Sequence, residues 1–265
     1  MSVLTPLFDE NFLLSVWYDE YQAFKASPEA AALESRLRLW ADREALSETQ
    51  SEAAFIARYF VETWGYAGQG VSPDGGYTFA QQYRLTGAGQ SGNTGSADLA
   101  LGNFGPGADG VPQVLCEFKD IRSGLDDPQP RKGSTRSPVE QGLDYLTAAF
   151  LTRNRAAAVV PAWAVVTDMN EFRLYSRLRG PSQCQRFVIR AAASADAPFA
   201  LLPSADAETA DAESFAFRRF IFIKLFGSSF LLARSGESAA EALLASHGLH
   251  EREIEEAFYS DYRDY

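Results

Sequence analysis

The sequence contains few of the residues that stabilise secreted domains or bind transition metals. Its 265 residues include only 2 cysteines, Cys116 and Cys184, and 2 histidines, His247 and His250. Two isolated cysteines argue against a disulfide framework and against a cysteine-based zinc site. Cys116 lies in an apolar run and is expected to be a small core residue. With these few histidines, neither a Ser-His-Asp triad nor a histidine-based nuclease motif can be assembled.

Long apolar runs and basic residues are also scarce. No apolar run approaches the roughly 20 residues of a membrane span, and the N-terminus lacks the features of a signal peptide, so we expect a reducing, cytoplasmic setting.

The net charge is −11, whereas proteins that hold DNA alone usually have a basic face. The acids concentrate in 195–213 and 251–264, while Arg131, Lys132 and Arg136 form a basic cluster. This balance predicts a domain that depends on another part for most of its DNA affinity.

The spacing of apolar residues divides the chain into four parts. Residues 1–46 show helical spacing, 47–190 mix strand and helix patterns, 191–213 have the composition of an exposed linker, and 214–265 are helical again. We therefore expect a mixed α/β core with helices packed on the sheet. The expected helices after residue 46 are 47–66, 138–152, 214–226, 238–246 and 251–265, and the expected strands are 77–84, 96–101, 113–119, 162–167, 172–176 and 186–190.

Two expected strands carry acids among apolar neighbours. Asp98 lies in ADLAL, Glu117 lies in LCEFK, and Lys119 follows Glu117 by two residues. Either acid alone is typical of the polar side of a strand, but a carboxylate inside an apolar strand is costly unless it is paired or binds a metal. Because strand side chains alternate, Glu117 and Lys119 project to one face. Two carboxylates, water and a phosphate oxygen suit Mg²⁺, and Lys119 can position an attacking water or stabilise developing charge.

The helix expected over 138–152 adds two polar side chains. Gln141 and Tyr145 are four residues apart and share a face. This face is expected to look toward the carboxylates, although a surface glutamine beside a half-buried tyrosine is the simpler interpretation. A separate apolar stripe, expected to pack on the core from the opposite side, contains Val139, Leu143, Leu146 and Phe150.

Two further patterns have competing interpretations. Glu48 and Glu52 open the helix expected at 47–66, where acids commonly offset the helix dipole; alternatively, one of them reaches a metal site. Residues Gly87–Gly92 match GxGxxG. However, this loop leads into a strand, and a dinucleotide site requires a helix N-terminus there. We expect a hairpin loop.

Taken in order, these segments resemble a known family. The runs SADLALGNF, VLCEFKDIRSGLDDPQPRKGSTRSPVEQGLDYL and PAWAVVTDMNEFRLYSR resemble the N-terminal endonuclease domain of type IIG restriction–modification enzymes. These enzymes belong to the PD-(D/E)xK nuclease superfamily. The resemblance covers about 47–190 and, more loosely, the C-terminal helices. It implies a restriction-endonuclease-like core and the hydrolysis of phosphodiester bonds in double-stranded DNA.

The resemblance also implies a role for each polar residue. It makes Asp98 and Glu117 the metal ligands and Lys119 the catalytic lysine. It makes Gln141 and Tyr145 the accessory pair near the scissile phosphate. The expected cofactor is Mg²⁺, for which Mn²⁺ can substitute.

The family's remaining features are found only in part. Glu48 corresponds to a helix carboxylate of the family, with Glu52 as the alternative if the register differs by one turn. Members also contain covalently linked methyltransferase and target-recognition domains. This sequence has no Asn-Pro-Pro-Tyr signature, so S-adenosylmethionine is not expected to bind it. The ending EEAFYSDYRDY resembles the segment that leads into the methyltransferase.

Two alternatives remain open at this point. One is a repair or junction nuclease of the same superfamily, against which the acidity of the chain argues. The other is an inactive DNA- or protein-binding module, against which the intact acid–acid–lysine set argues.

Overall fold

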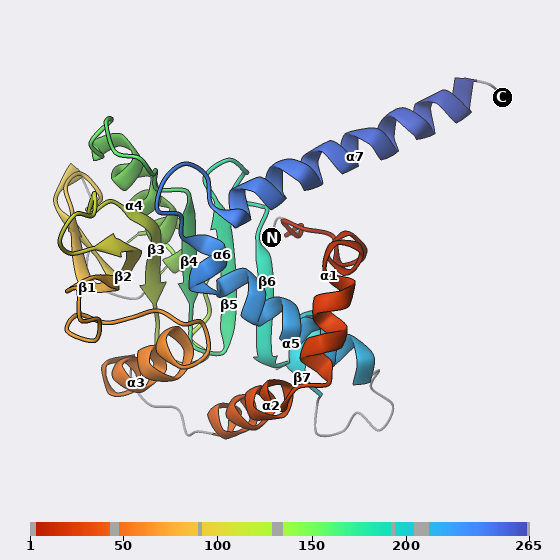
Figure 1. Cartoon of the computed structure of the whole chain (residues 1–265), viewed down its shortest axis with the longest axis horizontal. Helices are drawn as coiled ribbons and strands as arrows, with labels where there is room; N and C mark the ends of the chain where they lie inside the picture. The colour runs from red at the N-terminus through yellow and green to blue at the C-terminus, as the bar shows by residue number, and fades with distance from the viewer. Residues whose placement is uncertain are drawn as a thin grey trace.

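A mixed sheet flanked by helices forms the body of the protein (Figure 1). The computed structural model describes residues 4–42, 48–89, 92–128, 135–191, 194–203 and 212–263. Within these ranges the strands lie side by side in sequence order. They are β1 Tyr77–Leu85, β2 Gly95–Phe104, β3 Pro112–Phe118, β4 Trp163–Thr167, β5 Glu171–Ser176, β6 Gln185–Arg190 and β7 Ala200–Leu202. The α-helices are α1 Glu10–Lys25, α2 Pro28–Ala41, α3 Glu48–Phe55, α4 Pro138–Thr152, α5 Ala212–Phe226, α6 Ser228–Leu231 and α7 Ala239–Arg263.

The sheet is antiparallel except at two neighbouring pairs. Strands β3 and β4 run parallel, as do β6 and β7, and the remaining neighbours are antiparallel. The chain passes from β3 to β4 through α4, because parallel neighbours need a crossover connection. Every residue of β3 and β4 is buried, as expected for central strands covered on both faces. The expected mixed α/β architecture is therefore confirmed.

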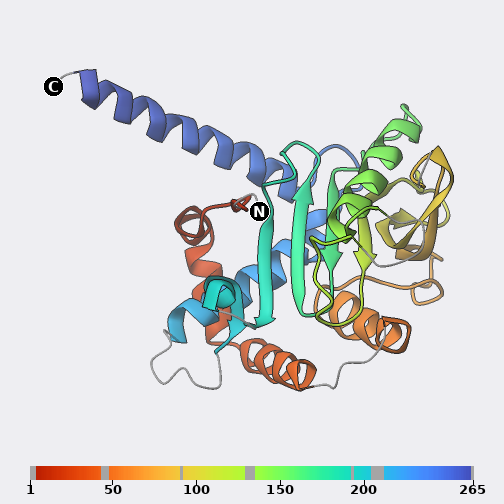
Figure 2. The same cartoon turned by 180° about the vertical axis from the view of Figure 1, so that it is seen from behind.

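Each face of the sheet has its own apolar core. On one face, α4 covers a cluster that includes Leu115, Ala164 and Val166. On the other face, the remaining helices enclose a larger cluster rich in aromatic rings, and Figure 2 shows this two-sided arrangement from behind. The N-terminal and C-terminal helices belong to this second layer together: Trp17 of α1 lies edge-on to Phe220 of α5, with ring centroids 6.2 Å apart.

Helix α4 begins and ends where the sequence predicts. The Ser137 hydroxyl accepts from the Glu140 backbone N–H at 3.2 Å, and the Glu140 carboxylate accepts from the Ser137 N–H at 2.7 Å. This reciprocal cap satisfies two backbone donors at the start of the helix. Pro138 occupies the first turn, where its missing N–H has no consequence.

The helix expected over 47–66 is only partly α-helical. Its expected cap, Ser47, lies outside the described residues. After α3 the backbone widens into a π-helix, Ile56–Val61, and just beyond it the Trp64 N–H donates to the Tyr59 carbonyl at 2.9 Å. Phe55, Tyr59 and Trp64 are spaced by four and five residues, and the wider turn buries all three. Helical spacing alone did not indicate this widening.

The expectation of an exposed linker at 191–213 is wrong for its central part. A 3₁₀ helix, Ser194–Phe199, leads into β7, which pairs with β6. Residues Ala200, Leu201 and Leu202 are buried. Their run is too short to stand out among the alanines and acids around it, and only pairing with β6 makes it a strand.

The C-terminal helices also differ from expectation. The segments 238–246 and 251–265 were expected as two helices, but α7 is continuous from Ala239 to Arg263. Gly248 lies inside this helix, where the Arg179 guanidinium passes close to it. The end of α7 projects away from the body (Figure 1). None of the described helices is long and apolar enough to cross a membrane.

Candidate active site

The two predicted acids meet at one end of the sheet. Strands β2 and β3 pair with Leu99 opposite Cys116, so Asp98 and Glu117 lie one step beyond this pair. The Asp98 Oδ2 atom accepts a hydrogen bond from the Phe118 backbone N–H at 2.7 Å. This bond holds the Asp98 carboxylate at the end of β3, beside Glu117.

Lys119 forms an ion pair with Glu117, as their shared face predicted. Its Nζ contacts Glu117 Oε1 directly. The exposed fractions of the two side chains are 5% and 2%, so the pair is almost fully withdrawn from solvent. The Lys119 backbone N–H donates to the Thr167 carbonyl at 2.9 Å, which extends the β3–β4 pairing and fixes the direction of the lysine.

Helix α4 crosses directly over this pair because residue 142 is glycine. A Cβ at Gly142 would lie 2.7 Å from Val166 Cγ2 and 3.8 Å from Glu117 Cβ. The first distance is shorter than non-bonded carbon atoms tolerate, since their optimal separation is about 3.5–4.0 Å. Gly142 therefore sets how closely the helix approaches the site. Sequence reasoning missed it, although a glycine inside an otherwise strong helix is a recognisable signal.

Gln141 and Tyr145 interact as their spacing predicts, but Tyr145 faces the core. The Gln141 Nε2 atom donates to the Tyr145 hydroxyl at 2.6 Å. The Tyr145 ring packs so closely on Gly95 that a Cβ there would lie 2.8 Å from the ring. The sequence predicted that the apolar stripe lies on the side of α4 opposite Gln141 and Tyr145, and this prediction is wrong for Tyr145. It shares the buried, sheet-facing side of α4 with Val139, Gly142, Leu146 and Ala149, whereas Leu143 and Phe150 are only partly buried.

The charges at the site reach Tyr145. The pKa of Tyr145 is raised to about 12, first by burial, then by the negative charge of Glu117 and to a smaller extent by that of Asp98. The hydrogen bond from Gln141 acts in the opposite direction. The tyrosine therefore stays protonated at neutral pH and lies within electrostatic reach of both carboxylates.

A third acid approaches from α3. Burial raises the pKa of Glu52, and the negative charge of Asp98 raises it further. Glu52 is thus close enough to Asp98 to feel its charge. Glu48 is the first residue of α3, but its side chain lies outside the described residues. Glu52, the alternative named from the sequence, is the helix acid that the described structure brings to the site.

Part of the expected basic cluster is also at the site. Arg136 donates to the Ala88 carbonyl at 3.2 Å and to Asp144 at 2.6 Å, and its positive charge lowers the pKa of Tyr145. Arg131 and Lys132 lie outside the described residues.

Ala88 belongs to the glycine-rich loop joining the antiparallel strands β1 and β2, so the predicted hairpin is confirmed.

The loop that follows Lys119 is held by a buried arginine that sequence reasoning did not identify. Arg173 of β5 donates two hydrogen bonds to Asp126, at 2.6 and 2.8 Å. A bidentate arginine–carboxylate pair fixes orientation as well as position. The Asp126 side chain is still 56% exposed, whereas that of Arg173 is 4% exposed. The partners are 47 residues apart, too far for a local pattern to connect them.

The donor set at this site suits a small, hard cation. Carboxylate oxygens are the ligands that Mg²⁺ prefers, and Mg²⁺ usually keeps several waters and takes only one or two protein carboxylates. Asp98 and Glu117 provide that number. Among the residues that the structure describes, no group of three or more His, Cys, Asp or Glu side chains is arranged to hold a metal. Cys116 is fully buried, with its pKa raised by burial and then by Asp98 and Glu117, so it is a core residue rather than a ligand.

Comparison with family models, curated proteins and solved structures found no match for this chain.

Proposed function

We propose that this chain is a Mg²⁺-dependent DNA endonuclease with the restriction-endonuclease-like core of the PD-(D/E)xK superfamily. More specifically, we propose that it is the nuclease domain of a type IIG restriction–modification enzyme. The observation that carries the proposal is the grouping of Asp98, Glu117 and Lys119 at one end of β2 and β3, beneath the helix that bears Gln141 and Tyr145. These residues come from three separate segments, and each has the chemistry that phosphodiester hydrolysis needs.

Each residue has a distinct part in the proposed reaction. Asp98 and Glu117 would hold the cation, which supplies Lewis-acid stabilisation of charge on the phosphate and the leaving 3′ oxygen. Lys119 orients the attacking water and offsets the developing negative charge. Gln141 donates to the Tyr145 hydroxyl, and this bond would hold the partly exposed Gln141 side chain near the phosphate. Attack of water on phosphorus with departure of the 3′ oxygen yields a 5′ phosphate.

The charge of the chain bears on how DNA is held. Contacts of lysine and arginine with phosphates supply most of the non-specific affinity of a protein for DNA. With a net charge of −11, this chain is therefore expected to bind DNA weakly by itself. We propose that double-stranded DNA is gripped mainly by covalently linked methyltransferase and target-recognition domains. S-adenosylmethionine would bind there and not to this chain.

Cleavage of a supercoiled plasmid tests the proposal. The chain is assayed at micromolar concentration and low salt, where electrostatic binding is strongest, with Mg²⁺ or EDTA. Asp98→Ala and Lys119→Ala are compared with Asp127→Ala, which removes an exposed carboxylate of the nearby loop. We expect metal-dependent nicking that falls at least about 100-fold in the first two variants and persists in the third. The assignment is wrong if all three variants cut like the parent.

The buried Glu117–Lys119 pair favours one alternative. An ion pair with this little exposure can also serve as a fixed structural element, as expected in an inactive DNA- or protein-binding module. The absence of both Mn²⁺ binding and cleavage would support that module. Preference for branched over linear DNA would instead indicate a repair or junction nuclease.

A further inference from the structure

We propose that α7 and the turn between β5 and β6 form a docking surface for a basic, apolar helix of another polypeptide segment. This surface lies away from the proposed active site. Phe118 pairs with Thr167 at the C-terminal ends of β3 and β4, whereas Trp163 at the other end of β4 pairs with Ser176. The turn that follows Ser176 is therefore at the opposite end of the sheet from Glu117. The inference goes beyond the proposed function and does not depend on it.

The first half of α7 packs on the body, whereas the helix projects from the body beyond the Arg179–Glu251 ion pair. Leu244 and His247 are buried. From Leu249 onward, every side chain of α7 that the structure describes is exposed. A partner that covers this half would bury side chains that now lie in solvent.

One face of α7 carries a regular pattern of residues from Leu244 to Phe258. Leu244, Gly248, Glu251, Glu255 and Phe258 are separated alternately by four and three residues, the spacing of a seam that faces a single partner helix. Phe258 is 66% exposed and the adjacent Tyr259 is 65% exposed. Leu244 and Phe258 are about 21 Å apart along the helix at about 1.5 Å per residue.

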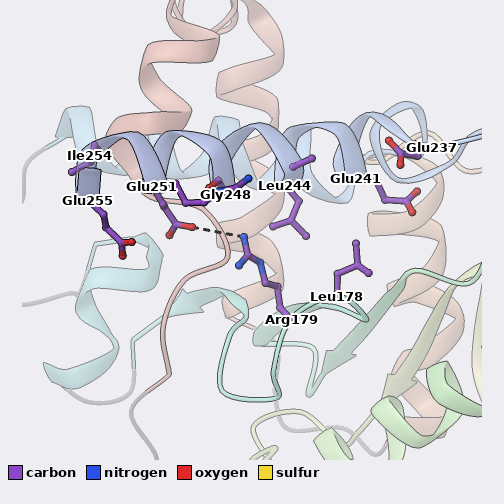
Figure 3. Close-up of a pocket in the computed structure, with 11 residues that line it drawn as sticks. Leu178, Arg179, Glu237, Glu241, Leu244, Gly248, Glu251, Ile254 and Glu255 are labelled. Carbon is purple, nitrogen blue, oxygen red and sulfur yellow. Dashed lines mark hydrogen bonds and ion pairs between the residues drawn. The ribbon is translucent and has the colours of Figure 1, made fainter. Parts of the chain in front are cut away.

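A groove of about 690 Å³ runs between this face and the β5–β6 turn. Its apolar side includes Leu178 and Leu244, which project toward each other in Figure 3. Its rim is acidic: the lining contains four glutamates and two arginines, a formal net charge of −2. The glutamates are Glu237, Glu241, Glu251 and Glu255, and the arginines are Arg179 and Arg252.

The groove already contains one cation of the kind that a partner would bring. The Arg179 guanidinium reaches across to Glu251, with Nη2 3.7 Å from Oε2 (Figure 3). Gly248 leaves room for it, since a Cβ there would lie 3.2 Å from Arg179 Nη2. Glu255 lies one turn further along the same face. A partner lysine or arginine opposite Glu255 would repeat this pairing.

Charge selects among the possible occupants. A second copy would place Glu251 and Glu255 against the same acids, and DNA would bring phosphates to an acidic rim, so like charges oppose both. The complementary partner is a helix with lysine or arginine in its middle turns and apolar residues about two heptads apart. Its apolar residues would contact Leu178 at one end and Phe258 at the other, which are 60% and 66% exposed.

Peptide binding to the full chain tests this inference. The probe is a fluorescently labelled 18-residue helical peptide, about five turns in length, with leucines near its ends and lysines between them on one face. Two comparison peptides replace the lysines by glutamate or the leucines by serine. In fluorescence anisotropy we expect each replacement to weaken binding at least about 10-fold, or about 1.4 kcal/mol.

Matched variants of the chain separate docking from general attraction to an acidic protein. Glu255→Lys changes the groove, whereas Glu253→Lys makes the same charge change on the opposite side of α7. Likewise, Phe258→Ser lies on the seam, and Leu249→Ser lies off it. We expect about 10-fold weaker binding for the first member of each pair and less than about 2-fold for the second. Equal effects within the pairs would overturn the proposal. So would dimerisation of the chain through α7. Mn²⁺ binding at Asp98 and Glu117 is expected to be unchanged in all four variants.

Discussion

Gly142 provides a sharp test of how the site is built. If α4 must lie this close to β3 and β4, then Gly142→Ala should destabilise the protein even though alanine favours helices. Gly248→Ala, in α7, is the matched control. A Cβ at Gly142 would clash with Val166 Cγ2 at 2.7 Å, whereas a Cβ at Gly248 would meet only the end of the Arg179 side chain at 3.2 Å.

The expected magnitudes follow from two opposing effects. Alanine in place of glycine inside a helix gains roughly 1 kcal/mol. Overpacking a core costs about 1–3 kcal/mol, and Val166 is fully buried with a branched, stiff side chain that cannot easily turn away. Gly142→Ala should therefore lose about 1 kcal/mol of unfolding free energy, with a range of about 0–2. Gly248→Ala should gain up to about 1 kcal/mol, because Arg179 can move.

Urea unfolding of the two variants measures this difference. We expect them to differ by about 2 kcal/mol, or about 4–8 °C in melting temperature for a domain of this size. In Gly142→Ala we also expect weaker metal binding, since the helix must move away from Glu117. If Gly142→Ala is as stable as Gly248→Ala, the close approach of α4 does not constrain the site.

Three further predictions concern single side chains. The folded pKa of Tyr145, about 12, exceeds the usual value near 10, so the contribution of this group to stability is complete below about pH 10 and is lost as the pH rises through 12. Tyr145→Phe should reduce this loss of stability in urea titrations, and an unchanged pH dependence would contradict the raised pKa. The pKa of Glu52 is also raised, so the stability that its protonated form contributes is present below pH 4.5 and is lost as the pH rises above that value. Metal-free Glu52→Gln should therefore be more stable than the parent at pH 7 and similarly stable at pH 4. An equal difference in stability at both pH values would argue against the raised pKa. Asp126→Asn removes one of two charged partners of buried Arg173, which also pairs with Glu171. Because the Asp126 side chain is 56% exposed, the loss should be about 1–1.5 kcal/mol of unfolding free energy, whereas Asp127→Asn should remain within about 0.5 kcal/mol. Equal effects would mean that the Arg173 contact does not stabilise the loop.

Local patterns were sufficient to predict most of the fold and the grouping of the site. Apolar runs bounded by turns located β1 to β6, and the Ser137–Pro138 cap located α4. Side-chain alternation in β3 predicted the contact of Glu117 with Lys119, and helical spacing predicted the bond between Gln141 and Tyr145. In each case the partners are close in sequence or their elements have a fixed period.

The features that sequence reasoning missed depend on contacts between distant segments. β7 becomes a strand by pairing with β6, and Asp126 is ordered by an arginine on β5. Tyr145 turns toward the sheet because Gly95 and Gly142 allow helix and strand to approach. A single sequence shows the glycines but not the atoms that would occupy the space of a side chain.

Metal binding is the claim on which the proposed nuclease most directly depends. Calorimetric titration of the chain with Mn²⁺ measures it without requiring DNA. We expect one site in the parent, binding at least about 10-fold weaker in Asp98→Ala and Glu117→Gln, and unchanged binding in Asp127→Ala. No binding by the parent, or equal binding by all four proteins, would contradict the account.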